Sequence, residues 1–69
     1  MKRRAVLKQI EREAKRQGID FFLSERTNHT GIQVGSVNTV IGRHVEVSET
    51  ARIRIFKQLE PALGRRWWQ

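Results

Sequence analysis

His29 is the residue whose type and surroundings most directly suggest catalysis. It lies in the polar segment Thr27-Asn28-His29-Thr30, between two runs with β-strand character, so the pattern places it at a hairpin turn. An imidazole titrates at about pH 6.5 and can take a proton from an RNA 2′-hydroxyl. The 2′-oxygen would then displace the 5′-oxygen and leave a cyclic phosphate. The alternative is that His29 caps the turn with a hydrogen bond.

Cationic side chains near such a histidine could stabilise the charge that develops on the phosphate oxygens. Arg26 and Arg43 flank the predicted hairpin and the end of the third predicted strand, so they are the candidate phosphate contacts. The alternative for both is a solvated salt bridge to Glu25 or Glu46, worth less than about 1 kcal/mol.

Three further groups of polar residues are candidates for RNA contacts. Asn28 adjoins His29, and His44 could hold an RNA phosphate or orient the site, or could instead be a surface loop residue with a structural hydrogen bond. Lys8, Arg12 and Lys15 recur at helical spacing and could follow an RNA backbone. The alternative for this stripe is a solvated helix face.

Other kinds of catalytic site find no support in the residues. There is no cysteine, and neither histidine has a carboxylate or a second histidine at metal-ligand spacing. The chain has no glycine-rich phosphate loop between a strand and a helix, and no set of serine, base and carboxylate. We therefore expect no metal and no cofactor.

The charge of the chain favours a polyanionic partner. The 69 residues carry 14 Lys and Arg against 7 Asp and Glu, a net charge of +7, concentrated in residues 1–18 and 48–69. Such an excess indicates nucleic acid as the partner, although a solubility surface or an acidic protein partner would also explain it.

Met1-Lys2-Arg3-Arg4 is basic but no apolar segment follows it, and no run reaches the length of a membrane span. We expect one domain over residues 1–69, in the cytoplasm and not in a membrane.

The apolar pattern predicts an α+β fold of order α-β-β-β-α. Apolar residues at helical spacing predict a first helix over 2–17, ended by Gly18, with Glu11 and Lys15 placed for an ion pair. Alternating and β-branched residues predict strands at about 20–26, 29–34 and 38–42, joined by tight turns. Ser48 is a good N-cap for a second helix over 49–60, which Pro61 and Gly64 end or kink. The expected architecture is a three-stranded antiparallel sheet with both helices on one face, as in double-stranded RNA-binding domains.

Two residues of the second helix depart from its apolar pattern. Arg52 projects toward the apolar side, where we expect its stem to lie over the sheet edge, and Ile53 projects away from it, where exposure would indicate a protein contact. The alternative is a rotated helix or a short dimer seam. The tail from Arg65 onward ends in Trp67-Trp68. We expect these tryptophans to fold back over the open sheet or to contact a partner protein, although base stacking is an alternative.

Several short motifs resemble the HicA family, the small toxins of type II toxin–antitoxin systems. They are Asn28-His29 after a basic residue, Gly42-Arg43-His44, and Val47-Ser48-Glu49 leading into Ile55-Phe56-Lys57-Gln58-Leu59; the segment Leu59–Gly64 and Trp67-Trp68 resemble the tail of some members. The similarity covers nearly the whole chain. Thr27 departs from the family's usual glycine and Gly42 from its usual proline, while Thr30 replaces a common histidine or acidic residue.

The resemblance implies a fold like that of double-stranded RNA-binding domains, ribosome-independent cleavage of mRNA with His29 as the catalytic group, and inhibition by a HicB-type antitoxin. The departures at Thr27 and Gly42 favour an alternative, a small nucleic-acid-binding module of the same fold without catalysis. A purely protein-binding subunit is a third possibility, for which an exposed Ile53 and the tryptophan tail are the only indications.

Overall fold

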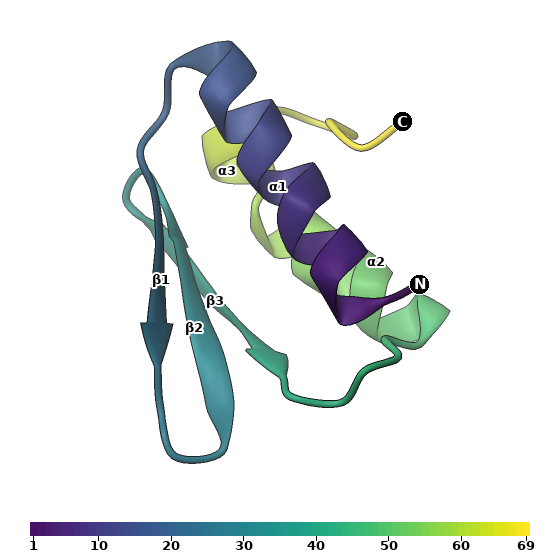
Figure 1. Ribbon diagram of the computed structural model, residues 1–69. Helices are drawn as coiled ribbons and strands as arrows, with labels where there is room; N and C mark the ends of the chain where they lie inside the picture. Colours follow the sequence, from purple (N-terminus) through teal and green to yellow (C-terminus); the bar gives the residue numbers. More distant parts are fainter.

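The first helix, α1, spans Arg3–Gln17 in the computed structural model, which describes all 69 residues (Figure 1). Val6, Ile10 and Ala14 are fully buried along one side of it, as their spacing predicts. Gly18 ends the helix in the left-handed conformation at φ 72°, and its N–H donates a hydrogen bond to a carbonyl of the last turn. The predicted helix and its glycine stop are therefore confirmed.

Three antiparallel strands form the sheet, in the order β1 (Phe21–Glu25), β2 (His29–Val34) and β3 (Val37–Gly42). Thr30, Ile32 and Val34 are buried beneath the helices, and Ile32 pairs with Leu23 on one side and Thr39 on the other. The strand bounds differ from the prediction by at most one residue at each end.

The opposite side of the sheet carries no helix (Figure 1). We call it the open face. Successive side chains of a strand alternate between faces, and paired residues share a face. The register therefore places nine residues on the open face. They are Phe22 and Ser24 from β1, Arg26 directly after β1, His29, Gly31 and Gln33 from β2, and Asn38, Val40 and Gly42 from β3.

The second helix, α2, spans Glu49–Gln58, and a short helix, α3, spans Glu60–Leu63. The Ser48 side chain accepts a hydrogen bond from the Ala51 N–H at 3.1 Å, which confirms the predicted N-cap. The second helix ends at Gln58, two residues before the predicted end, and the expected interruption at Pro61 and stop at Gly64 are present, because Pro61 fits the first turn of a new helix and cannot continue the old one. The fold class is confirmed: α-β-β-β-α, with the helices on one face of the sheet.

The tail packs against α2 and not against the open face. The Trp67 indole N–H donates to the Phe56 carbonyl at 2.8 Å, and the two rings meet edge to face at 4.7 Å between centroids. The ring centroid of Trp68 lies 5.8 Å from that of Phe56. Since Phe56 is fully buried, the tail extends the core on the helical side, and the expectation that it covers the open sheet is wrong.

Two expectations for α2 are corrected. The Arg52 guanidinium lies 5.4 Å from the centroid of the Phe56 ring and pairs with Glu49, so it covers the core's aromatic residue and not the sheet edge. Ile53 is half-buried rather than exposed, so the exposure that would have indicated a protein contact is not present. None of the helices has the length and apolar character that crossing a membrane requires.

Candidate functional site on the open face

His29 is the first residue of β2 and lies directly opposite Gly42 of β3. Its main-chain carbonyl accepts a hydrogen bond from the Arg26 N–H at 2.9 Å, which closes the β1–β2 hairpin. Because Thr30 is buried beneath the helices, the alternation of the strand turns the His29 imidazole to the open face, where it is half-buried. The hairpin predicted around His29 is confirmed.

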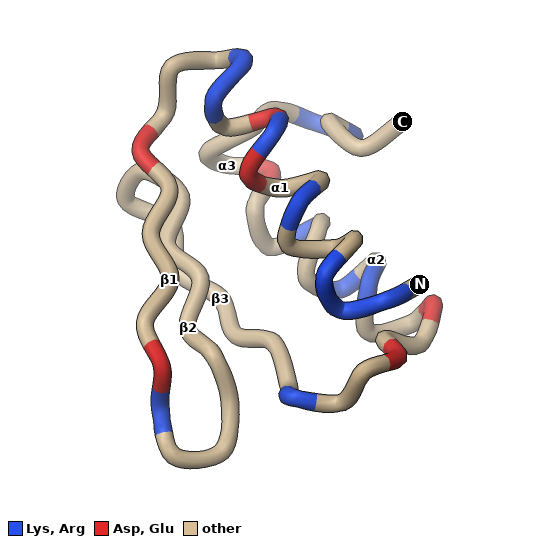
Figure 2. Tube along the Cα trace, viewed as in Figure 1, with Lys and Arg blue, Asp and Glu red and all other residues tan.

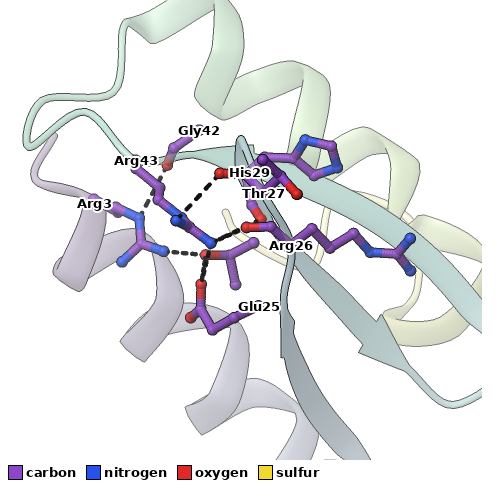
Figure 3. A network of polar contacts seen from close by, with 8 residues as sticks. Arg3, Glu25, Arg26, Thr27, His29, Gly42 and Arg43 are labelled. Carbon is purple, nitrogen blue, oxygen red and sulfur yellow. Dashed lines mark hydrogen bonds and ion pairs between the residues drawn. The ribbon is translucent and has the colours of Figure 1, made fainter.

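Arg26 is the cation nearest to His29 in the register of the sheet. Its backbone pairs with that of His29, and its side chain extends over the open face, away from the polar contacts beneath the hairpin (Figure 3). Gly31 makes room for it: a Cβ at position 31 would lie 3.2 Å from the Arg26 Nε and 2.8 Å from the Ser24 hydroxyl. Arg26 takes part in none of the ion pairs of the structure, so its charge is available to an anion beside His29.

Arg43 occupies the other side of the hairpin. Its guanidinium pairs with Glu25 at 2.9 Å and donates to the main-chain carbonyls of Arg26, Thr27 and His29 (Figure 3). The ion pair with Glu25, one of the two roles that the sequence left open for Arg43, is present. The guanidinium is engaged by four oxygen acceptors of the hairpin, which ties the loop after β3 to the turn that carries His29.

A second arginine continues this network into the core. Arg3, at the start of α1, donates to the Gly42 carbonyl at 3.0 Å and to the Thr30 hydroxyl, which in turn donates to Glu25 at 3.0 Å. Thr30 is fully buried, and its two hydrogen bonds offset the free-energy cost of removing its hydroxyl from water. The helix start, the hairpin and the end of β3 are thereby joined through Glu25.

The remaining candidates near the hairpin lie apart from this network. Asn28 is exposed at the tip of the hairpin. The ring of His44 lies beside Gly42, 3.8 Å from where a Cβ would stand. It lines a groove of about 290 Å³ between β3 and α2, together with Arg54. No hydrogen bond joins His44 to His29.

The basic stripe of α1 lies on a different surface from His29. Lys8 and Arg12 are exposed on the side of α1 opposite Ile10, which packs into the core between helix and sheet. Lys and Arg residues recur along the length of α1 (Figure 2). The imidazole of His29 faces away from the helices. The structure therefore does not bring Lys8 and Arg12 together with His29, a separation that helical spacing alone could not show.

Several carboxylates outside the open face are held in ion pairs. The Arg16 guanidinium, followed by the Gln17 amide, lowers the pKa of Glu13 to about 2 by hydrogen bonding to its carboxylate. The same type of hydrogen bond, from Lys2 to Glu46 and from Arg52 to Glu49, lowers the pKa of those two carboxyl groups. The predicted pair of Glu11 and Lys15 is present at 3.7 Å. No cluster of three or more His, Cys, Asp or Glu side chains is placed to hold a metal ion.

Four residues of the open face were not predicted as site residues from the sequence: Phe22, Gln33, Asn38 and Val40. They line a hollow beside Arg26 and Gly31. Gly31 lies within β2, as the predicted strand over 29–34 implies. The signal that could have revealed the set is the strand alternation itself, because it separates Phe22 from the residues that face the core.

Comparison with known proteins gives no relative from which the site could be assigned. No protein-family model matches the chain, and neither a curated protein nor a solved structure does so.

Proposed function

We propose that this protein is a metal-independent endoribonuclease that cleaves mRNA, the toxin of a HicA-type toxin–antitoxin system. The observation that supports this function best is the pairing of His29 with Arg26 across the hairpin, with both side chains on the open face and Arg26 free of any carboxylate. A general base and an unpaired cation beside it are what cleavage by a 2′-hydroxyl requires.

The chemistry assigns a role to each of the two side chains. The neutral imidazole of His29 takes the proton of the 2′-hydroxyl, and the 2′-oxygen forms a bond to phosphorus. The bond from phosphorus to the 5′-oxygen breaks, and the leaving oxygen receives the proton from the imidazolium. The products are a 2′,3′-cyclic phosphate and a 5′-hydroxyl. Arg26 stabilises the negative charge on the non-bridging oxygens as the phosphorus gains its fifth ligand.

The toxin role rests on the resemblance of the motifs at His29, Arg43-His44 and Ser48 to the HicA family. In this proposal the free protein acts in the cytoplasm and harms its host. A HicB-type antitoxin neutralises it by covering His29. The antitoxin's acidic groups would complement a chain with a net charge of +7.

A second function is favoured by the position of the basic stripe. Lys8 and Arg12 face away from His29, so an RNA held along α1 would not present its phosphates to the imidazole. A non-catalytic RNA-binding module of the same fold would use this stripe alone. The two functions predict different consequences of removing His29.

The deciding experiment is cleavage of single-stranded RNA in EDTA by the purified protein, beside His29→Ala and the control His44→Ala. The proposal expects cleavage by the wild type, its loss in His29→Ala and its retention in His44→Ala. Cyclic phosphate ends identify the reaction. Cleavage that persists in His29→Ala overturns the catalytic assignment, and RNA binding without cleavage by all three proteins supports the binding module.

A further inference from the structure

The open face has a hollow of about 220 Å³ next to His29. The register arranges its residues in two rows across the sheet, Phe22–Gln33–Asn38 and Ser24–Gly31–Val40, and the third row contains His29. Gly31 lies at the centre of the second row, where the Ser24 hydroxyl and the Arg26 Nε come within 2.8 Å and 3.2 Å of the place that a Cβ would take, so these two side chains wall the hollow on that side. Rows on one face are about 7 Å apart along a strand, so the hollow lies within one nucleotide's reach of His29.

The walls of the hollow suit a flat aromatic ring with polar edges. Phe22 is 57% exposed and Val40 is 39% exposed, so both present apolar surface to solvent. The Gln33 amide N–H donates to the Gly35 carbonyl at 3.1 Å, which fixes the amide and leaves its oxygen as an acceptor. The Asn38 side chain makes no hydrogen bond within the protein and offers both a donor and an acceptor.

The charge of the open face matches a ligand that carries a phosphate. None of the nine residues on this face is acidic, and Arg26 stands at the edge of the hollow with no carboxylate partner. An aromatic side chain, a free amide and an unpaired cation form the combination that binds unpaired bases of single-stranded RNA. The volume is smaller than the roughly 300 Å³ at which pockets for drug-sized molecules begin, which fits a single base.

We propose that this hollow binds one unpaired nucleobase of the RNA, that of the nucleotide adjoining the phosphate held at His29 and Arg26. Phe22 stacks on the base, and the Asn38 amide contacts its hydrogen-bonding edge. The assignment rests on the proposed ribonuclease function for the position of the cleaved bond. It gives the nuclease a preference among bases at one position, which the basic stripe of α1 cannot supply because phosphate contacts carry no sequence information.

The test uses short single-stranded 2′-O-methyl oligonucleotides, which lack the attacking hydroxyl, and a sugar–phosphate oligomer of equal length without bases. Phe22→Ala should weaken binding of the base-bearing probes by about 5- to 150-fold, the range of one stacked base, and should leave the abasic probe unchanged. Phe22→Trp, which keeps an aromatic ring at this position, should bind the base-bearing probes with the affinity of the wild type. Val45→Ala is the matched control, because Val45 is an exposed apolar residue outside the open face. Asn38→Ala should reduce the affinity differences among adenine, uracil and cytosine probes.

Each other outcome separates this proposal from the ribonuclease function. An equal loss for base-bearing and abasic probes, or no loss in Phe22→Ala, overturns the base site even if the wild type cleaves RNA. Base-dependent binding that Phe22→Ala abolishes, in a protein that cleaves nothing, supports the base site and overturns the nuclease. Absence of binding to every probe, as expected if a protein side chain occupies the hollow, also overturns the base site.

Discussion

Arg43 and Glu25 form an ion pair at 2.9 Å across the base of the hairpin that carries His29. The same guanidinium donates to the carbonyl of His29 itself at 3.4 Å and to that of Arg26. Arg43 thus contacts the backbone of both residues whose side chains form the proposed site. Its position indicates that it holds the hairpin in place.

Arg43→Ala is expected to slow cleavage more than it weakens RNA binding. The hairpin loses its tie to the loop after β3, and a displacement of about 1 Å at a catalytic group can cost about 100-fold in rate. Unfolding free energy should fall by only about 1 kcal/mol, because the pair is partly exposed. Arg43→Lys should also be slow, since an ammonium cannot bond several divergent carbonyls as a guanidinium does.

The readouts for Arg43 are the single-turnover rate at saturating RNA and the dependence of RNA affinity on salt. Arg54→Ala, which removes an exposed cation of α2, is the matched control. A salt slope that falls in Arg43→Ala by the amount expected of one lost phosphate contact, with an unchanged rate, would show a direct contact and contradict the role in positioning.

Local patterns predicted the elements of this fold because each depends on residues close in sequence. Helical spacing, Gly18 and Ser48 place the ends of α1 and the start of α2. The contacts that build the site join distant residues, as Arg43 does with Glu25 and Arg3 with Thr30, and no periodicity encodes them. The same holds for faces: the sequence shows that α1 has a basic side, but the packing of α1 on the sheet decides that this side is turned away from His29.

Lys8→Ala and Arg12→Ala are expected to weaken RNA binding without slowing cleavage at saturating RNA. Each side chain that contacts a phosphate contributes about 0.7 to the slope of log affinity against log salt for a single strand. The stripe faces away from His29, so its loss leaves the site itself unchanged. Arg26→Ala, in contrast, should lower the rate at saturation.

Lys57→Ala is the control for the stripe, because it removes an exposed cation of α2 that forms no ion pair. If Lys8→Ala slows the saturated reaction as much as Arg26→Ala does, the RNA passes over both surfaces and the separation of the two sites is contradicted.

Acid should destabilise the fold in part through Glu13. Hydrogen bonds from Arg16 and Gln17 lower the pKa of Glu13 from 4.5 to about 2, so its ionised form stabilises the folded state above about pH 4.5. That contribution is lost as the pH falls from 4.5 toward 2. Glu13→Gln should therefore lose less stability than the wild type between pH 6 and pH 2.5 in urea unfolding. Glu11→Gln, which makes the same charge change on the same helix, is the matched control, and identical losses in Glu13→Gln and wild type would contradict the prediction.

Trp67 is expected to be needed for stability although it lies third from the end of the chain. Its indole N–H donates to the Phe56 carbonyl near the end of α2, which also accepts from the Leu59 N–H, and its ring covers the buried Phe56 side chain. Trp67→Phe should cost about 1 kcal/mol for the lost hydrogen bond, and Trp67→Ala about 3 kcal/mol once the ring packing is lost as well. For a domain of this size each kcal/mol lowers Tm by about 4–8 °C.

Trp68→Ala should have a smaller effect than Trp67→Ala, because Trp68 lies farther from Phe56 and donates no hydrogen bond. Thermal unfolding followed by circular dichroism measures all three, and a Trp67→Ala protein that melts with the wild type would show that the tail does not pack on α2 in solution.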